Sequence, residues 1–240
     1  SDLLLPVEAS ILQQDHQRVL LMSVRPLIDR VSSEPIVDQI ARDLQRQGYS
    51  IQPNAITGTL AESLWSEVSQ LSDDWFHQAG IGRARDYQLN RFNRTDSVCW
   101  IDGTTEPCQH WLQHTEMLRA SLNQRCFLGL FSYESHYARY LPGQYYKRHL
   151  DAFQGEANRV VSTVLYLNPG WQPDDGGELV IYESATDTVG IRVTPAFGTL
   201  VCFMSEAFPH EVLKAKRTRY SIAGWYRLNQ SSIDRVDPPR

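Results

Sequence analysis

Two side chains with metal-binding and proton-transfer chemistry lie two positions apart in the stretch YYKRHLDAF, residues 145–153. They are His149 and Asp151. The stretch has the composition of a β-strand, in which residues i and i+2 point to the same face. An imidazole and a carboxylate side by side suit a metal site, a proton relay or an ordinary surface pair. The spacing by itself leaves these three alternatives open.

A third candidate ligand, His210, begins a later predicted strand in the stretch FPHEV. Two histidines and one carboxylate can occupy one face of an octahedral metal and leave three positions open. An oxygenase needs that arrangement, because a chelating cosubstrate takes two positions and dioxygen takes the third. The three residues together therefore favour the metal-site alternative.

The last predicted strand, RYSIAGWYRL, offers a site for an anion. Its alternate residues share one face and are Arg219, Ser221, Ala223 and Trp225. A guanidinium followed by two small side chains suits a dicarboxylate that enters there. Arg219 could bind the far carboxylate in bidentate fashion, and the small residues would leave it room.

A second histidine pair, His110 and His114, lies on a predicted helix with Cys108 nearby. Two histidines on one helical face can bind zinc. The segment lacks the glutamate of an HExxH motif, so we interpret the pair as surface or packing residues. The cysteines are irregularly spaced and form no CxxC motif, which is typical of reduced thiols in a cytoplasmic protein. They are Cys99, Cys108, Cys126 and Cys202.

The elements that must position these residues change character along the chain. Apolar periodicity and turn residues predict helices over 35–47, 60–78 and 105–122, a weaker helical pattern over 7–23, and short strands over 49–54 and 98–103. From residue 126 onward, eight short runs rich in β-branched and aromatic residues alternate with turns. The pattern predicts an α+β fold that is mainly β, with a double-stranded β-helix (jelly roll) supported by N-terminal helices.

We expect a single domain over 35–228, with helical support over 35–125 and the jelly-roll core over 126–228. Residues 1–34 would be an N-terminal extension and residues 229–240 a C-terminal tail. The 240 residues are 42% hydrophobic and 21% charged, which is typical of a globular protein. A net charge of −5 without a long basic run argues against a nucleic-acid partner, and the apolar stretches are too short for a membrane span or a signal peptide.

Taken together, these motifs resemble the iron(II)- and 2-oxoglutarate-dependent prolyl 4-hydroxylases. The resemblance is strongest to the branch that contains the hypoxia-inducible-factor prolyl hydroxylases and their bacterial relatives. The motifs that carry it are HLD, FPHEV and TRYSIAGWY, with YLPGQYYKRHLD, STVLYLN, GGELVIY and VCWIDG in matching order. It covers residues 35–228 and fades at both ends.

The resemblance implies roles for the residues that match the family motifs. His149, Asp151 and His210 would bind iron(II), and Arg219 would bind the 5-carboxylate of 2-oxoglutarate. Tyr166, in the stretch LYLN, matches a tyrosine whose hydroxyl supports that carboxylate.

The chain also departs from the hypoxia-sensing branch in the cosubstrate pocket. Leu141 stands where that branch has a tyrosine, which makes Tyr140 and Tyr146 the candidates for the pocket. Ala223 replaces a threonine of that branch, so Ser221 is the candidate for the missing hydrogen bond. The last match, Trp225, corresponds to a tryptophan near the mouth of the active site.

An arginine-rich stretch, RARDYQLNRFNRTD over residues 83–96, lies where the family closes over its substrate. Its arginines are Arg83, Arg85, Arg91 and Arg94. Two interpretations stay open: a solvated loop, or a lid whose arginines contact the substrate.

The function that the resemblance implies is hydroxylation of a prolyl residue in a protein, with iron(II), 2-oxoglutarate and O2, release of succinate and CO2, and ascorbate as an optional reductant. Some bacterial relatives act on a translation elongation factor, which makes that partner the first to try. The alternatives are hydroxylation of a free amino acid or other small molecule, and a jelly-roll binding module without catalysis.

Overall fold

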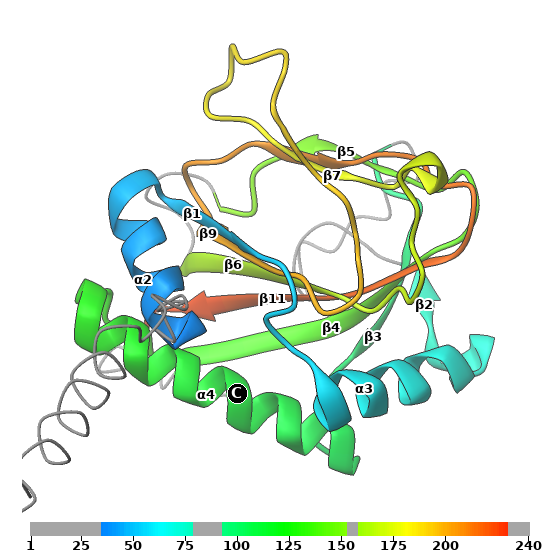
Figure 1. The fold of residues 1–240 in the computed structure, drawn as a ribbon, viewed down its shortest axis with the longest axis horizontal. Coiled ribbons are helices and arrows are strands. Elements are labelled where there is room, and N and C mark those ends of the chain that lie inside the picture. The colour runs from blue at the N-terminus through cyan, green and yellow to red at the C-terminus, as the bar shows by residue number, and fades with distance from the viewer. Residues whose placement is uncertain (1–34, 79–92, 153–157, 230–240) are drawn as a thin grey trace, which may run out of the picture. The chain divides into compact units, whose positions relative to one another are not determined.

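Helices pack on one side of the fold, and local sequence explains where they begin and end (Figure 1). The computed structural model describes residues 35–78, 93–152 and 158–229; its helices are α2 (Ile36–Gln47), α3 (Gly58–Gln70) and α4 (Glu106–Cys126). The first ends at Gly48, whose φ of 79° is left-handed and suits glycine. The last begins after Thr105, whose side chain accepts a hydrogen bond from the backbone N–H of Cys108, and it continues past its predicted end at 122.

The second helix is shorter than its apolar spacing predicted. It ends at Gln70, and the chain continues as a 3-10 turn, η1 (Asp73–Trp75), and a two-residue strand, β2 (His77–Gln78). Asp73 helps to explain why the helix stops early, because in the 3-10 turn its carboxylate pairs with Arg139 at 2.6 Å. Phe76 is consequently buried, whereas Trp75 is 63% exposed rather than part of an apolar stripe.

Two antiparallel sheets face each other beyond the helices. The large sheet has the order β1-β9-β6-β11-β4-β3-β2, and the small sheet has the order β5-β10-β7-β8. The remaining bounds are β1 (Tyr49–Gln52), β3 (Ser97–Trp100), β4 (Ser132–Tyr140), β5 (Tyr146–His149), β6 (Arg159–Tyr166), β7 (Leu179–Ile181), β8 (Ile191–Val193), β9 (Leu200–Met204), β10 (His210–Val212) and β11 (Arg219–Arg227). Each of the eight runs predicted after residue 126 contains one strand, and the predicted double-stranded β-helix is confirmed.

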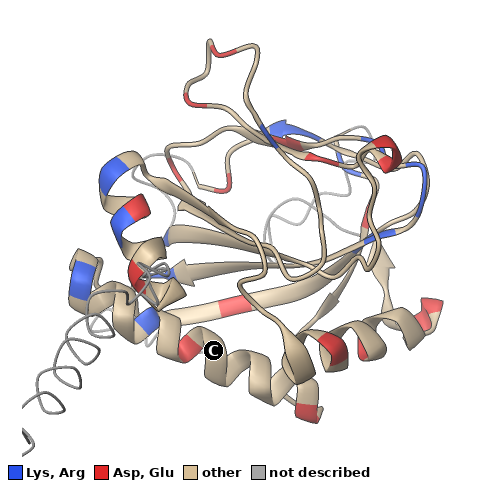
Figure 2. Ribbon diagram, in the orientation of Figure 1, with Lys and Arg blue, Asp and Glu red and all other residues tan. Residues whose placement is uncertain are grey.

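Strand alternation divides the interior into two apolar clusters. On the helix side of the large sheet, Ile222 and Tyr226 of β11 pack with Trp111 and Leu118 of α4. Between the two sheets lies a second cluster, to which β9 contributes Phe203. Figure 2 shows that most charged side chains lie on helices and loops and few on the strands of the large sheet. The charged residues inside the fold therefore stand out against an apolar surrounding.

In the ranges that the structure describes, no helix combines the length and the apolar character that crossing a membrane requires. The helical pattern predicted over 7–23, the N-terminal extension as a whole and nearly all of the C-terminal tail lie outside the described residues. The domain limits at 35 and 228 accordingly stay a prediction.

Candidate metal centre and cosubstrate pocket

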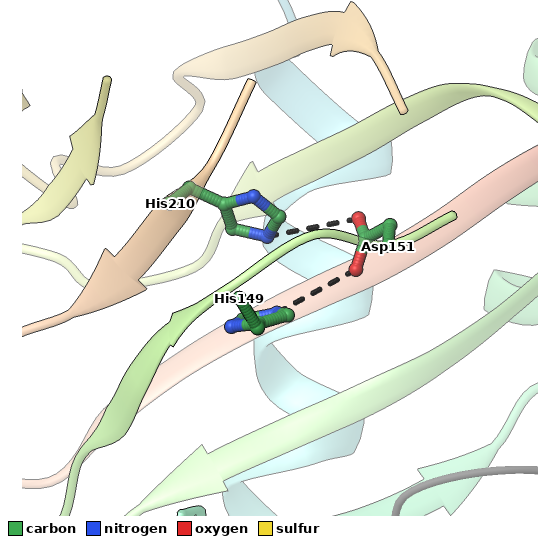
Figure 3. Close-up of side chains that lie close together, drawn as sticks. All are labelled: His149, Asp151 and His210. Atoms are coloured by element: carbon green, nitrogen blue, oxygen red, sulfur yellow. Dashed lines mark ion pairs between the residues drawn. The ribbon is translucent and has the colours of Figure 1, made fainter. Parts of the chain in front are cut away.

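Three potential metal ligands converge at the edge between β5 and β10 (Figure 3). His149 ends β5 and His210 begins β10, and the register of the two strands makes them Cα partners. Asp151 approaches both, with Oδ1 3.6 Å from Nε2 of His149 and Oδ2 3.7 Å from Nε2 of His210. We had expected His149 and Asp151 to share a strand face, but β5 ends at His149 and Asp151 lies in the bend that follows. Strand pairing and this bend together bring the three ligand atoms within 4.8 Å of one another.

Both imidazoles are oriented by backbone carbonyl groups. Nδ1 of His149 lies 2.8 Å from the carbonyl oxygen of Lys147, and Nδ1 of His210 lies 3.0 Å from that of Phe208. A carbonyl oxygen only accepts, so Nδ1 must carry the proton in each ring. The lone pair of Nε2 therefore faces Asp151, which is the tautomer that a metal ligand needs.

The electrostatics of Asp151 and His210 favour the forms that bind a metal. Burial opposes ionisation of Asp151, but His210 and His149 outweigh it and hold the pKa of this carboxyl well below its usual range. Burial, with a smaller contribution from His149, lowers the pKa of His210 to about 4. At neutral pH the site thus combines an ionised carboxylate with a neutral imidazole. Ser162 supports the carboxylate, donating a hydrogen bond of 2.6 Å to its Oδ2.

This donor set is the two-histidine, one-carboxylate combination of non-haem iron(II) sites with open positions. In the described part of the chain, it is the one group of three such residues close enough to share a metal ion. His110 is exposed, and His114 stacks on Trp111 with ring centroids 6.0 Å apart. The zinc site considered for this histidine pair therefore has no third ligand among the described residues. The residues present fit an iron(II) ion.

A buried guanidinium lies deeper between the sheets. Arg219 is 1% exposed, and its Nε donates a hydrogen bond of 2.8 Å to the carbonyl of Gly177. Its Nη1 lies 3.4 Å from Oγ of Ser221. Among the residues described, no acidic side chain forms an ion pair with Arg219. A buried charge without a counter-ion is costly, so this site is suited to an anionic ligand.

Two tyrosines enclose the guanidinium. The rings of Tyr140 and Tyr166 each lie with their centroid 5.0 Å from Cζ of Arg219. The Tyr166 hydroxyl is buried and has no hydrogen-bond partner among the described residues. Burial raises the pKa of Tyr166 to about 12 even though Arg219 acts in the opposite direction. A protonated hydroxyl beside a guanidinium is the donor pair that a carboxylate would accept.

The two candidate tyrosines of the sequence lie in different places. Tyr140 faces Arg219, whereas Leu141 is 43% exposed and points elsewhere. Tyr146 stacks on His149, with ring centroids 3.5 Å apart. Trp225 is buried at the other end of β11 from Arg219.

Of the four loop arginines, Arg94 is described, and Arg83, Arg85 and Arg91 lie outside the described residues. Arg94 forms a bidentate pair with the fully buried Asp96, at 2.8 and 2.7 Å, and stacks on the ring of Tyr146 at 4.4 Å. The solvated-loop interpretation is wrong for this arginine. Burial would lower its pKa, but Asp96 outweighs burial and raises it.

Several residues around the site were missed in the sequence. Glu134 and His136 are both buried on β4, and Arg159 of β6 bonds to the Glu134 carboxylate at 3.0 Å. The sequence carried one usable signal, because Glu134 and His136 alternate in a strand as His149 and Asp151 seemed to do. Ser162 gave no such signal, since its contact with Asp151 joins β6 to the bend after β5 and is set by the fold.

We expect His136 to make folding sensitive to acid. Burial, together with Arg94, lowers its pKa from 6.5 to about 4. The unfolded chain therefore takes up a proton near pH 6.5, and the folded chain does so only near pH 4. Stability should be fully present above pH 6.5 and fall as the pH drops through this window, by about 1.4 kcal/mol per pH unit for this residue.

Denaturant unfolding at several pH values, with wild type and His136→Phe compared in metal-free buffer, measures this effect. The variant should lose less free energy of unfolding than wild type between pH 7 and pH 5. Parallel pH profiles for the two proteins would contradict a buried neutral imidazole at this position.

Comparisons with known proteins agree with this chemistry. Residues 135–227 match the family model described as 2OG-Fe(II) oxygenase superfamily. A solved Pseudomonas putida prolyl-4-hydroxylase is 37% identical with a TM-score of 0.71, and the match covers 80% of this chain and 98% of that one. A Trichoplax adhaerens prolyl hydroxylase, solved with a hypoxia-inducible-factor oxygen degradation domain peptide fragment, is 25% identical with a TM-score of 0.66, covering 92% and 94%. Mouse prolyl hydroxylase EGLN3 is 28% identical over 219 residues, which are 83% of this chain and 87% of the relative.

Proposed function

The chain belongs to the 2OG-Fe(II) oxygenase superfamily as a dioxygenase of the prolyl 4-hydroxylase type, and on this premise we propose that it hydroxylates a prolyl residue in a protein substrate. The observation that carries the proposal is the combination of a three-donor metal site with a buried, unpaired guanidinium between the same two sheets. Iron(II) with 2-oxoglutarate supplies the oxidising power that places one oxygen atom of O2 in a C–H bond and the other in succinate, with loss of CO2.

His149, Asp151 and His210 would hold the iron(II) ion. Three protein ligands on one side leave positions for the cosubstrate and for O2. The carbonyl contacts on both imidazoles fix the ring orientations before the metal arrives, which reduces the cost of organising the site. The serine beside Asp151 would steady the carboxylate in the same way.

Arg219 would bind the far carboxylate of 2-oxoglutarate, with the Tyr166 hydroxyl as a second donor. Because Nε of Arg219 is occupied by the Gly177 carbonyl, the two terminal nitrogens are the ones to face the ligand. Ser221 shares the strand face of Arg219 and would supply a further hydrogen bond beside Ala223. Tyr140 would close the pocket beside Arg219.

The protein substrate is proposed because the similar proteins are named prolyl hydroxylases, and one of them is solved with a peptide. A translation elongation factor is the first candidate to test. The four cysteines are all free thiols, which supports a reducing compartment such as the cytoplasm. Ascorbate would serve as a reductant that keeps the iron in its iron(II) state.

The test is incubation of a dialysed bacterial extract and of purified elongation factor with enzyme, iron(II), 2-oxoglutarate and ascorbate under isotopically labelled O2. We expect succinate formation and one labelled oxygen on a proline of a protein, located by peptide mass spectrometry. Asp151→Ala enzyme and omission of 2-oxoglutarate are the controls. Label in free amino acids without label in protein would favour the small-molecule alternative, and a lack of succinate in all reactions would favour a binding module.

A further inference from the structure

A hollow of about 560 Å³ lies where β5 pairs with β10, and it gathers most of the chain's amines. Its lining includes Tyr145, Lys147, Glu211, Leu213 and Lys214. The whole chain has three lysines, Lys147, Lys214 and Lys216, so two of the three line this one hollow. Its volume falls within the range of ligand sites, which is roughly 300–1,000 Å³.

Strand alternation places the hollow on the outer face of the small sheet. Tyr146 and Val212 are opposite each other on β5 and β10, and both pack into the apolar cluster between the two sheets. Their neighbours Lys147 and Glu211 therefore project to the other face. The hollow is consequently separate from the positions proposed for iron(II) and 2-oxoglutarate, which lie between the sheets.

One wall of the hollow is held by contacts within the small sheet. The register of β5 and β10 shifts here, so that two residues of β5, Lys147 and Arg148, oppose Glu211 alone. The guanidinium of Arg148 stacks on the ring of Tyr182 at 3.7 Å, and the Tyr182 hydroxyl donates a hydrogen bond to the Glu211 carboxylate. The one carboxylate among the described lining residues is thus already engaged by a neighbouring donor.

The surface around the hollow is locally positive. Lys214 is exposed, its amine lies 5.4 Å from the centre of the Tyr145 ring, and no acidic side chain in the described ranges forms an ion pair with it. Figure 2 shows lysine and arginine on β5 and on the segment that joins β10 to β11. In a chain of net charge −5, this face is suited to an anionic partner.

The backbone beside the hollow is already paired, so recognition here would use side chains. The backbone N–H of Lys147 donates to the carbonyl of Asn93 at 2.8 Å, and that of Thr95 donates to the carbonyl of Tyr145 at 3.1 Å. These bonds occupy the edge of β5 that an added strand would need. The side chains offer ammonium groups beside aromatic and aliphatic surface, which matches carboxylates that alternate with an apolar group.

We propose that this hollow docks an acidic segment of the protein substrate, at a distance from the hydroxylated prolyl residue. The proposal rests on the proposed function and deepens it by naming a second contact with the substrate. Lys147 and Lys214 pair with aspartate or glutamate side chains, and an apolar side chain lies on Tyr145 and Leu213. Docking away from the reacting atoms raises the effective concentration of the prolyl residue and leaves the chemical step unchanged.

The three lysines allow a direct footprint, because each amine can be followed by peptide mass spectrometry after mild acetylation. The probe is a proline-free peptide with the repeat Glu-Leu-Glu-Gly, and its control carries glutamine in place of every glutamate. At about twice its Kd, the acidic peptide should slow acetylation of Lys147 and Lys214 by about 3-fold. Lys216 is outside the lining and should react as in the free protein. Added salt should remove the protection.

Two charge variants should change the affinity in opposite directions. Combining Lys147→Gln with Lys214→Gln should weaken binding of the acidic peptide by about 5-fold, since exposed ion pairs are individually weak. Glu211→Gln should strengthen it by about 2-fold, because a negative charge is lost while the amide oxygen still accepts from Tyr182. Loss of folding cannot produce such a gain. Lys216→Gln is the matched control and should bind as wild type does.

A second measurement connects the hollow with the substrate. A prolyl peptide carries the acidic repeat through glycine–serine linkers of increasing length. At the linker length that spans the two sites, KM should fall several-fold at unchanged kcat, and the double lysine variant should lose this advantage. If no linker length lowers KM, the segment does not belong to the substrate and the proposal is wrong.

The footprint needs neither iron(II) nor 2-oxoglutarate, so its outcome is independent of the proposed function. Equal protection by the glutamine peptide, by acetate at the same carboxylate concentration, or in the double lysine variant would overturn the docking proposal while prolyl hydroxylation stands. If the footprint appears but wild type hydroxylates neither peptides nor proteins, the proposed function is overturned, and with it the assignment of the acidic segment to a substrate.

Discussion

Asp151→Ala should abolish measurable 2-oxoglutarate turnover while the protein stays folded. The carboxylate is the one negative charge among the three ligands, and it directs one oxygen toward each imidazole. Removing it would leave two neutral nitrogens to hold iron(II) in an otherwise open site. Loss of a residue that merely orients a ligand already costs about 10- to 100-fold in metal affinity or activity, so loss of the ligand itself should cost more than about 100-fold.

The measurement is an anaerobic titration with iron(II), followed by succinate formation in air. Ser162→Ala is the graded comparison, since it removes only the hydrogen bond of 2.6 Å to Asp151 and should cost less. Asp174→Ala changes an exposed aspartate on the turn η2 (Pro173–Asp175) and should behave as wild type. Wild-type iron affinity in the Asp151→Ala protein, with an unchanged circular dichroism spectrum, would exclude Asp151 as a ligand.

The sequence predicted the three candidate metal ligands because their residue types, and the strand ends beside them, can be read from short stretches of chain. His149 ends β5, His210 begins β10 and Asp151 lies in the bend after β5, so each residue is next to a recognisable strand boundary. The detail of their geometry was not predictable in the same way. The pairing of β5 with β10 places His210 opposite His149 across about sixty residues of chain, and only the folded sheet fixes that register.

The same limit applies to the contact between the rings of Trp100 and His136, whose centroids lie 5.1 Å apart. Trp100 and His136 meet through the pairing of β3 with β4, which are separated by the whole of α4. Local alternation could place His136 on one face of its strand but could not name its neighbour. The predicted end of α3 was wrong for another reason. The apolar spacing continues to Trp75, but the turn-forming residues after Gln70 and the Asp73–Arg139 pair favour a turn instead of a further helical stretch.

Arg94 shows a third kind of limit. Four arginines in a polar stretch resemble a solvated loop, since arginine is mostly exposed in proteins. A partner two residues away, Asp96, instead takes Arg94 into a buried pair that stacks on Tyr146. Composition alone cannot distinguish these outcomes, because the pair is also covered by the ring of Tyr146, which belongs to a strand about fifty residues further along.

Arg219→Ala should weaken 2-oxoglutarate binding far more than iron(II) binding. The guanidinium is buried, its Nε is held by Gly177, and no acidic residue in the described ranges neutralises it. The far carboxylate of 2-oxoglutarate would be its counter-ion in a site with little water. Losing a charge-assisted bidentate contact of this kind costs on the order of 2–5 kcal/mol, which is roughly 30-fold or more in affinity.

Two further variants separate the charge from its geometry. Arg219→Lys should recover only part of the affinity, because an ammonium group lacks the planar fork that matches a carboxylate. Tyr166→Phe removes one donor, whose hydrogen bond to a charged group is worth about 1.5–3 kcal/mol, and should therefore have an intermediate effect. The Michaelis constant for 2-oxoglutarate and the iron affinity are measured for each variant, with thermal unfolding as the check on folding. An Arg219→Ala enzyme that keeps the wild-type Michaelis constant would place the cosubstrate elsewhere, because no other described residue offers a buried, unpaired cation between the two sheets.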